Sequence, residues 1–546
     1  MRPATPDDRR VRPVLAAAAV ALGVLLVVRP LTGVDALLLV TTAGIALTGG
    51  HELVTADRRR DRAVGVALLV GALVLALQPL WGVRLLTWAF GAILIGGGLQ
   101  RLRRPTWSDR SLGVGLVVLG VLALAWPDVA VFAMGVLVGL RLVLLAFPRV
   151  TVPTPVTATV VLTAAVVLAG CTVWVVSSAP RPDGFYAAPP DTPRSPGLLL
   201  KAEPFTTDVP DGARAWRILY STTRADDEPT VASALVAVPR DELMGRAPVI
   251  AWAHGTTGFR PRCAPSLKTR HTIGAGGVDA VHAALDRGWA VVAPDYAGLG
   301  TRGVQPYLIG SGEARSVLDA VRAARRIPQL NLGRRTTVWG HSQGGHAALW
   351  TAMSQPEYAP DVPLAGVAAM SPVSNPTTFL RDLQRRPVGT IFVAYALAAY
   401  DATYDDVHAS DHVRASARIP LERIADRCLR SRVKHVSLAQ ARIMADRFVK
   451  GSLYEGGLAR RLAENDATGA IAAPVLIAQG GSDRVVTQRL QDAYVRERCE
   501  AGQSLDYRTY EGRGHGDLLR EESPFVEELL TWTADRFASK PTTTTC

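Results

Sequence analysis

Seven apolar stretches fill most of the first 180 residues, and no other feature constrains the fold of this chain as strongly. About 20 apolar residues are needed to cross a hydrocarbon core about 30 Å thick, so several of these stretches are only just long enough to span a membrane. We therefore predict an all-α transmembrane bundle of about seven helices over residues 13–176. The apolar stretches lie at roughly 13–28, 34–50, 63–78, 83–100, 111–126, 129–147 and 156–176.

A repeat within this region supports the spans. Pro30, Pro79 and Pro127 lie 49 and 48 residues apart, and each separates an apolar run from a Gly-rich apolar run. Self-similarity at such a period indicates a repeated unit, so we predict three helix hairpins that turn at these prolines, plus one connecting helix. Small residues in TAGIALTGG and GAILIGGG would allow close contact between the helices. Residues 13–147 resemble the short-repeat membrane proteins related to the acid-resistance protein HdeD, which implies a membrane bundle and no known chemistry.

Arginine positions predict the orientation of the bundle. The N-terminus and the second and fourth connections are rich in Arg, whereas the alternate turns hold only Arg29 and Arg84. Because basic connections stay on the cytoplasmic side, we expect residues 1–12 to be cytoplasmic. Seven spans then place everything beyond about residue 177 outside the cell membrane, which makes this a multi-pass membrane protein with an extracytoplasmic C-terminal part.

The net charge is explained by the same topology. The chain carries a formal charge of +12, of which +8 falls within residues 1–180, beside the apolar stretches. This placement indicates topology and argues against a nucleic-acid partner. A cleaved signal peptide in the first stretch is the alternative, and it is disfavoured because VVRPLTG lacks a small-x-small cleavage pattern.

The remainder of the chain has the pattern of an α/β domain. Residues 177–197 are rich in Pro and polar residues, which is typical of an extended spacer. Over residues 198–540, short apolar strands such as APVIAWAHG alternate with amphipathic helices such as EARSVLDAVRAARRI, which predicts a largely parallel sheet. Some 95 residues, about 374–468, lack strand alternation and interrupt this sheet late, so we expect them to form a helical cap.

A candidate nucleophile lies at the end of one predicted strand. Gly340-His341-Ser342-Gln343-Gly344 is a G-x-S-x-G motif that follows the strand TTVWG and precedes the helical pattern GGHAALWTAMSQ. A nucleophile elbow requires this strand-turn-helix context, and its glycines relieve clashes around a strained serine. We therefore predict Ser342 as the nucleophile.

Chain order supplies a base and an acid. In this architecture the order is Ser, acid, His, and His515 is the one histidine after the cap, in the Gly-flanked loop EGRGHGD. Asp483 follows the strand PVLIAQGG and is the candidate acid. Their alternatives are a solvated loop histidine and a turn or N-cap aspartate. The expected roles are attack by Ser342, proton transfer by His515 and orientation of the imidazole by Asp483.

Two backbone amides are candidates for an oxyanion hole. The N–H of Gln343 follows the nucleophile, and Thr256 lies in the loop HGTTG after the strand APVIAWA. His254 and His341 could be taken for zinc ligands. Since no H-x-x-x-H or carboxylate spacing accompanies them, we expect packing or hydrogen-bonding roles for both, and no metal.

From about Phe185 to Ala538 the chain resembles the secretory lipase family of α/β-hydrolases. The resemblance rests on FYAAPP, SPGLLLKAEP, AWRILYST, WAHGTTG, CAPS, PDYAGLG, GHSQGG and the order of acid and histidine. It implies an α/β-hydrolase fold, a helical cap over an acyl pocket, the same triad, and no metal or organic cofactor. On this mapping Asp295 and Tyr296 lie near the site, Asp295 either orienting the oxyanion loop or serving as a turn residue. Members of this family are usually released by a signal peptide, whereas this chain is predicted to stay tethered.

The chain has five cysteines. The resemblance favours a disulfide between Cys263, beside the oxyanion loop, and Cys428, in the cap, which an oxidising exterior would permit. Cys499 is then left over. The alternative is that all the cysteines are reduced.

Together these features predict a membrane-tethered extracytoplasmic serine hydrolase that cleaves carboxylic esters of lipids or other acyl compounds. The apolar stretch TIFVAYALAAY, residues 390–400, would suit an acyl chain, although it could equally be core. Three alternatives stay open: an acyltransferase acting on envelope acceptors with the same triad, a peptidase, and a membrane scaffold or stress protein whose hydrolase domain is inactive.

Overall fold

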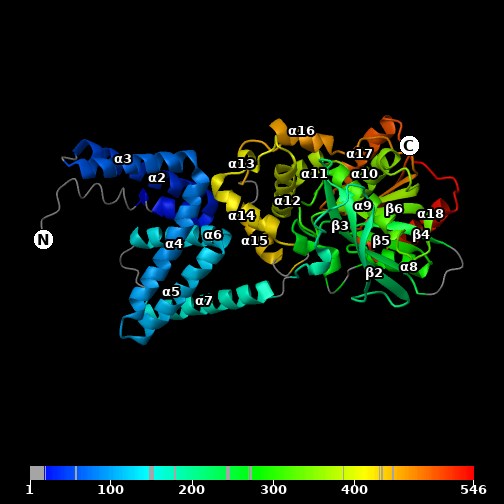
Figure 1. The fold of residues 1–546 in the computed structure, drawn as a ribbon. Coiled ribbons are helices and arrows are strands. Elements are labelled where there is room, and N and C mark those ends of the chain that lie inside the picture. The colour runs from blue at the N-terminus through cyan, green and yellow to red at the C-terminus, as the bar shows by residue number, and fades with distance from the viewer. Residues whose placement is uncertain are drawn as a thin grey trace. The chain divides into compact units, whose positions relative to one another are not determined.

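A computed structural model gives the fold of the chain (Figure 1). It divides into two compact units. The helical unit comprises Met1–Ser178, Ser410–Arg423 and Ala439–Gly451, and the sheet unit comprises Ala179–Ala409, Ile424–Leu438 and Ser452–Cys546. The structure describes residues 17–18, 20–55, 58–146, 153–177, 180–240, 246–268, 270, 273–384, 386–429, 431, 434–444 and 448–546.

Long apolar helices make up most of the helical unit. Each of the three repeated prolines stands at the first position of a helix, where its missing N–H is not needed and its fixed φ suits helical backbone. By length and composition, four segments in the described part could cross a membrane: Val34–Thr55, Pro79–Leu102, Trp107–Ala125 and Thr154–Val173. The helices are α2 (Pro30–Thr55), α3 (Arg59–Leu77), α4 (Pro79–Leu102), α5 (Trp107–Ala125), α6 (Pro127–Ala146) and α7 (Thr154–Ser177).

Glycines set which helices pack together. A Cβ added to Gly98 of α4 would lie 2.7 Å from the carbonyl oxygen of Gly113 in α5, and one on Gly49 of α2 would lie 2.9 Å from that of Gly65 in α3. Two close pairs are therefore α2 with α3 and α4 with α5, each joined through an Arg-rich connection, and α5 also packs on α7.

The hairpins therefore differ from those predicted across the prolines. Only Gln78 separates α3 from α4, and only Trp126 separates α5 from α6. An antiparallel helix hairpin needs a loop of about two to five residues, so one residue is too short to fold the second helix back along the first.

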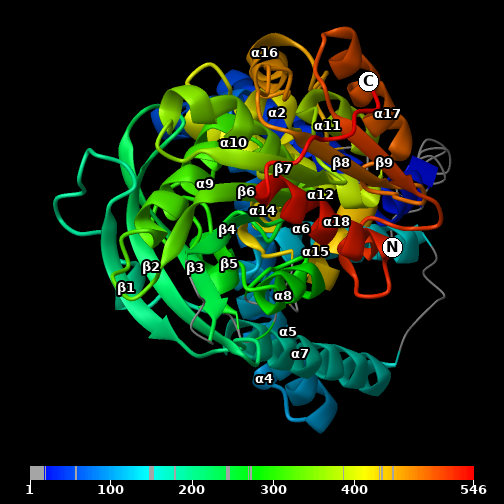
Figure 2. The ribbon, with the colours of Figure 1, turned by 90° about the vertical axis from the view of Figure 1, so that its right-hand side faces the viewer.

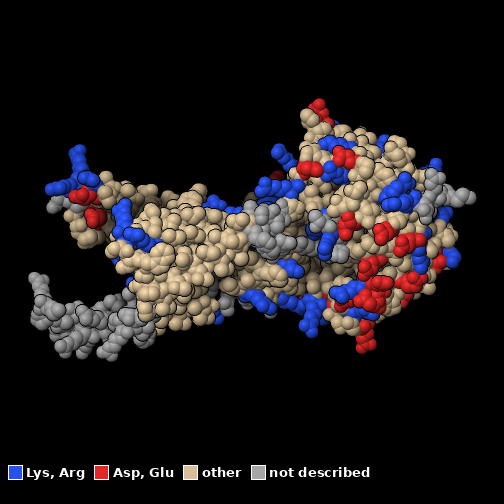
Figure 3. Space-filling model, turned by 90° about the horizontal axis from the view of Figure 1, so that it is seen from below, with Lys and Arg blue, Asp and Glu red and all other residues tan. Residues whose placement is uncertain are grey.

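The surface of these helices is apolar. Leu39, Leu47 and Ile93 are 71 %, 76 % and 71 % exposed. In the view of Figure 3, charged side chains gather toward the ends of the N-terminal helices and leave a broad uncharged area between them. Such exposure is unusual for a protein surrounded by water and suits contact with lipid.

The helical unit also contains segments from much later in the chain. Gln440 Nε2 donates a hydrogen bond of 2.7 Å to Asp128 Oδ2, and both side chains are buried. Part of the insertion described below therefore belongs to the same compact body as the apolar helices.

A nine-stranded mixed sheet forms the centre of the sheet unit, in the order β1-β2-β3-β5-β4-β6-β7-β8-β9. The strands from β4 to β9 are parallel, and β1, β2 and β3 add an antiparallel edge. The central strands are apolar runs buried on both faces, as parallel sheets require. The strands are β1 (Leu199–Phe205), β2 (Ala213–Thr223), β3 (Pro229–Pro239), β4 (Ala247–Ala253), β5 (Ala290–Pro294), β6 (Leu332–His341), β7 (Leu364–Met370), β8 (Val475–Gly480) and β9 (Asp506–Tyr510).

Helices cover both faces of this sheet (Figure 2). One face packs against α9 (Gly310–Ala324), α10 (Gln343–Tyr358) and α17 (Gln488–Glu500), and the other against α8 (Val278–Asp286) and α18 (Pro524–Phe537). The three layers hold the carboxyl ends of the parallel strands at one edge, where such folds place their ligands.

An insertion of helices separates β7 from β8. Its helix α12 is almost wholly buried, from Gly389 to Tyr400, which matches the apolar stretch noted in the sequence. The insertion consists of α11 (Pro376–Leu383), α12 (Pro387–Thr403), α13 (Ala409–His412), α14 (Ala415–Asp426), α15 (Lys434–Met444) and α16 (Gly456–Glu464).

Candidate active site

Ser342 lies at the sharp turn between β6 and α10. Its φ of 59° and ψ of −119° fall in a region that residues with a side chain rarely adopt. The turn is held because Ser342 N donates to Met370 O at 2.9 Å, while Ser342 O accepts from Gly345 N at 3.0 Å. Strained backbone of this kind persists where the surrounding structure fixes it, as at a nucleophile elbow.

The flanking glycines are required by close backbone contacts. A Cβ on Gly340 would lie 1.9 Å from Gly344 O, and a Cβ on Gly344 would lie 1.9 Å from Ala253 O. No side chain fits at either position, which is the physical reason for the G-x-S-x-G spacing.

The structure brings together the three residues that the sequence singled out as a triad. His515 Nε2 lies 2.9 Å from Ser342 Oγ, and His515 Nδ1 lies 2.7 Å from Asp483 Oδ2. Ser342 follows β6, Asp483 follows β8, and His515 lies in the loop after β9, so all three stand at the carboxyl edge of the sheet. Proton transfer from the serine to the imidazole is geometrically direct.

The site around Asp483 favours its ionised form. Burial alone would raise the pKa of this carboxyl, but the hydrogen bond and charge of His515, together with the Val485 N–H, hold its pKa below the usual range. Asp483 Oδ1 accepts from Val485 N at 2.7 Å and from Val486 N at 3.0 Å. Oδ2 is thereby directed at the imidazole.

The loop HGTTG after β4 runs beside the serine. A Cβ on Gly255 would lie 3.1 Å from His341 O and 3.5 Å from Ser342 Cβ. Gln343 is fully buried at the first position of α10, and Thr256 is buried in the loop. The amino end of α10 carries partial positive charge, which suits a developing oxyanion.

His254 and His341 hold parts of the site together through backbone contacts. His254 Nδ1 lies 2.7 Å from Gly255 O, and Tyr296 OH donates to His254 O at 3.0 Å. His341 Nε2 lies 2.7 Å from His515 O, and the two imidazole rings are 4.7 Å apart. Tyr296 is buried, and its φ of 65° lies in the left-handed region that residues with a side chain rarely adopt.

Asp295 is buried next to the site and contacts segments that adjoin it. Its carboxylate accepts from Ser233 Oγ at 2.6 Å, from Ser266 Oγ at 2.5 Å and from Ser266 N at 3.0 Å, and its carbonyl lies 3.3 Å from His254 Nε2. Burial raises the pKa of Asp295 to about 6. It joins the CAPS segment to the HGTTG loop and does not contact Ser342, Asp483 or His515 through any of these bonds.

Two disulfides are present. Cys263 is bonded to Cys428, which joins the core to the insertion beside the HGTTG loop. Cys499, left without a partner by the sequence analysis, is bonded to Cys546 at the C-terminus. Leu429 N donates to Thr257 O at 2.9 Å, so the insertion is hydrogen-bonded directly to the HGTTG loop.

Helix α12 contacts this loop through Tyr307. Tyr395 and Tyr307 meet edge to face with ring centroids 5.7 Å apart, and Tyr307 OH lies 3.2 Å from Thr256 Oγ1. Tyr400 OH donates to Leu308 O at 2.8 Å. Ser342 is only 6 % exposed.

A buried polar network beside Ser342 was missed by the sequence analysis. Glu313 contacts both Gln343 and His346, and His346 contacts the carbonyl of Asn465. His346 follows Ser342 by one helical turn, so a polar residue on the buried face of α10 was the available signal. Its partners come from α9 and from the end of the insertion, which no local pattern connects.

Comparisons with known proteins agree with this architecture. A family model described as secretory lipase matches residues 271–545, half of the chain. A probable inactive lipase of Mycobacterium tuberculosis is 28 % identical over 388 residues, which cover 67 % of this chain and 84 % of that protein. A secreted triacylglycerol lipase of Malassezia globosa is 27 % identical over 391 residues, covering 67 % and 81 %.

A solved structure shows the fold. Candida antarctica lipase A in its closed state superposes with a TM-score of 0.56 at 19 % identity, over 66 % of this chain and 87 % of that one.

Proposed function

Because the chain belongs to the secretory lipase family, we propose that it is a membrane-tethered serine hydrolase that cleaves carboxylic esters outside the cytoplasmic membrane. The observation that carries this proposal is the unbroken hydrogen-bonded series from Ser342 through His515 to Asp483. The HGTTG loop and the amino end of α10 lie beside the same serine.

The proposed reaction proceeds through an acyl-enzyme. His515 Nε2 takes the proton of Ser342 as Oγ attacks the ester carbonyl, and Asp483 stabilises the imidazolium that forms. The N–H groups of Gln343 and Thr256 stabilise the oxyanion. His515 then protonates the departing alcohol, and water, activated by the same imidazole, releases the acid and regenerates the serine.

An acyl chain is the best occupant for the apolar surroundings of this site. The insertion places Tyr395 and other buried apolar side chains of α12 near the oxyanion loop. Ser342 is only 6 % exposed, so we expect substrate to reach it after part of the neighbouring insertion moves. A lipid interface that attracts apolar helices would favour such an opening.

Three observations support an extracytoplasmic site. The described helices include four apolar enough to cross a membrane, and Arg-rich connections alternate along the chain with Arg-poor turns, which puts the Arg-rich connections on one side of the spans. Both disulfides lie in the sheet unit, and disulfides persist in oxidising compartments. A secretory lipase family likewise implies action outside the cytoplasm.

One relative named as a probable inactive lipase makes activity the first property to test. The full-length chain in lipid nanodiscs is assayed against p-nitrophenyl esters of increasing acyl length, beside Ser342→Ala and His515→Ala. His435→Ala, an exposed histidine of the insertion, serves as the matched control. We expect turnover to be lost in both site variants and kept in the control.

The products distinguish the remaining alternatives. Free carboxylic acid identifies a hydrolase, whereas acyl transfer to an added alcohol in preference to water identifies an acyltransferase with the same triad. A folded wild-type chain that neither turns over any ester nor reacts with a fluorophosphonate probe contradicts the proposal and favours a non-catalytic scaffold.

A further inference from the structure

Glu313 is a fully buried carboxyl group in the first turn of α9, close to the nucleophile helix. Its Oε1 accepts from Gln343 Nε2 at 2.8 Å and from Leu308 N at 3.0 Å. Its Oε2 lies 2.7 Å from His346 Nδ1. A buried carboxyl is unfavourable unless it is fully hydrogen-bonded, so its presence here calls for a reason beyond packing.

His346 extends this network to the end of the insertion. Its Nε2 lies 2.8 Å from the carbonyl oxygen of Asn465, which can only accept, so Nε2 carries the proton. Nδ1 then faces Glu313 either as the acceptor from a carboxylic acid or as the donor of an imidazolium. Asn465 Oδ1 in turn accepts from Gly310 N at 2.9 Å, which closes a ring of contacts around the start of α9.

The residues just before α9 contact the other half of the oxyanion hole. Tyr307 OH lies 3.2 Å from Thr256 Oγ1. Leu308 has a φ of 55°, which is unfavourable for leucine. It is held there because its N–H is bound by Glu313 and its carbonyl by Tyr400 of α12.

We propose that Glu313 is a positioning residue for the oxyanion hole. It fixes the side chain of Gln343 directly, and it fixes Tyr307, and so Thr256, through Leu308. Both N–H donors thereby keep their direction toward the oxyanion position. The inference rests on the proposed function, since it assigns a role within that site.

The size of the effect follows from what such donors contribute. Removing one oxyanion donor lowers kcat by about 10²–10³-fold. Loss of Glu313 leaves both N–H groups in place but less well aimed, so we expect a fall in kcat of about 10- to 100-fold. Because the ester itself binds mainly through its acyl chain, KM should change by less than about threefold.

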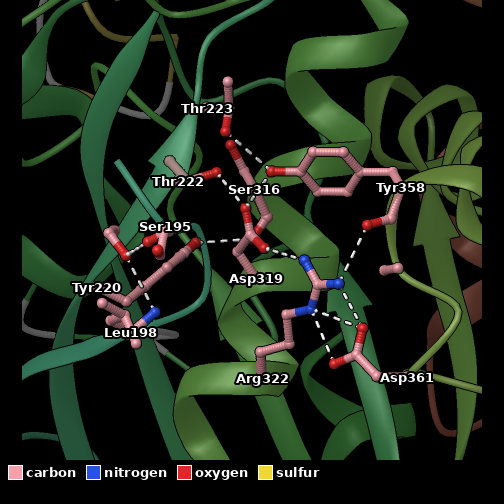
Figure 4. Close-up of polar contacts among 12 residues, drawn as sticks. Ser195, Leu198, Tyr220, Thr222, Thr223, Ser316, Asp319, Arg322, Tyr358 and Asp361 are labelled. Atoms are coloured by element: carbon pink, nitrogen blue, oxygen red, sulfur yellow. Dashed lines mark hydrogen bonds and ion pairs between the residues drawn. The ribbon is translucent and has the colours of Figure 1, made fainter. Parts of the chain in front are cut away.

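A matched control exists on the same helix. Asp319 is also a fully buried carboxylate of α9, and it accepts from Thr222 Oγ1 at 2.8 Å and from Tyr358 OH at 2.7 Å (Figure 4). Its ion pair with Arg322 completes a network whose members are not among the proposed site residues. Replacement of Asp319 therefore reports what loss of a buried carboxylate from α9 does to stability alone.

The experiment compares Glu313→Ala, Gln343→Ala, their double variant, Glu313→Gln and Asp319→Ala in the full-length chain. Active sites are counted by titration with a fluorophosphonate, and kcat per site, KM and the Ki of an alkyl trifluoromethyl ketone are measured. That ketone forms an oxyanion when it adds to the serine, so its Ki measures directly how well the oxyanion hole binds such a group.

In Glu313→Ala and in Gln343→Ala, we expect kcat to fall. Within each variant, the affinity for the ketone should weaken by the same factor as kcat. The double variant should lose little more than Glu313→Ala alone, because the Gln343 side chain acts only through its contact with Glu313. Glu313→Gln should recover most of the activity, since an amide can accept from Gln343 and Leu308 and donate to His346. Asp319→Ala should lower the Tm and leave kcat per site within about twofold.

Several results would overturn it. One is that Glu313→Ala lowers only the Tm or the number of titrated sites, as Asp319→Ala does. Another is that the losses of the two single variants multiply in the double variant. If Glu313→Ala yields no folded chain, Tyr307→Phe, which removes only the hydroxyl beside Thr256, must lower kcat and ketone binding together. A wild-type chain without ester turnover or fluorophosphonate labelling overturns the proposed function, and the role of Glu313 with it.

Discussion

Oδ2 of Asp483 lies 2.7 Å from Nδ1 of His515, and this contact determines which face of the imidazole meets the serine. With its proton on Nδ1, the ring presents the lone pair of Nε2 to Ser342 Oγ, 2.9 Å away. The backbone N–H groups of Val485 and Val486 hold the other carboxylate oxygen, so the aspartate cannot turn without losing both.

Replacing Asp483 with Asn should therefore leave the fold intact and disable the base. The Asn side chain can still accept from Val485, but its amide would donate to Nδ1 and stabilise the tautomer with the proton on Nε2. We expect kcat to fall by roughly 10³- to 10⁴-fold at neutral pH with the Tm little changed. Asp492→Asn on α17, where Asp492 accepts from Tyr507 OH, is the control and should keep full turnover. Comparable losses in both variants would contradict the assigned role.

Asp295 should make stability depend on pH. The pKa of Asp295 in the folded chain is about 6, against an ordinary value of 3.8. At a pH between these two values, the carboxyl is protonated in the folded state and ionised in the unfolded state. Stability is then highest below about pH 4 for this group and falls as the pH rises through about 6, by about 3 kcal/mol in total.

The measurement is the difference in Tm between wild type and Asp295→Asn across pH 4 to 7. Asn cannot ionise, so the wild type should lose stability relative to the variant as the pH rises. Contributions from other titrating groups cancel in the difference. A difference that stays constant over this range would show that Asp295 is not protonated in the folded state at low pH.

The two disulfides should have different effects on activity. Cys263–Cys428 closes a segment of 165 residues beside the oxyanion loop, whereas Cys499–Cys546 closes one of 47 residues at the C-terminus. Loop-closure entropy predicts a stabilisation of about 4 to 5 kcal/mol for each as an upper bound. Only the first bond also fixes Leu429 against Thr257.

Paired alanine variants test this difference, each serving as the control for the other. Both pairs should lower the Tm, but only Cys263→Ala/Cys428→Ala should lower kcat per titrated site, by about tenfold or less if the loop shifts without losing its donors. Equal kcat in the two paired variants would mean that the oxyanion loop is rigid without the bond.

The candidate triad could be predicted because local rules apply to each of its members. A G-x-S-x-G between strand and helix admits one backbone geometry, since Gly340 and Gly344 have no space for a Cβ. The sequence order of acid and histidine then limits the candidates for these two residues to the loops that follow the last strands. The disulfide between Cys263 and Cys428 came from family resemblance and not from spacing.

What could not be predicted depends on contacts between distant segments. Glu313, His346 and Asn465 come from three elements that only the folded sheet brings together. The edge strand β1 has no buried residue and lacks the apolar alternation that marks the others. Cys499 gave no sign of pairing with Cys546, because a short C-terminal tail can reach many surface positions.

Helix pairing in the helical unit was predicted at the wrong turns, and the structure supplies a test of the pairing it shows instead. Gly98 and Gly97 are neighbours on α4, but a Cβ on Gly98 would lie 2.7 Å from Gly113 O, while one on Gly97 meets no atom within 4 Å. Gly98→Ala should therefore separate α4 from α5 and destabilise the full-length chain by about 1–3 kcal/mol, seen as a lower Tm in detergent. Gly97→Ala adds the same methyl group and the same helix propensity without the clash, so it should be neutral or slightly stabilising. If both variants have the same Tm as the wild type, α4 and α5 do not pack through this face.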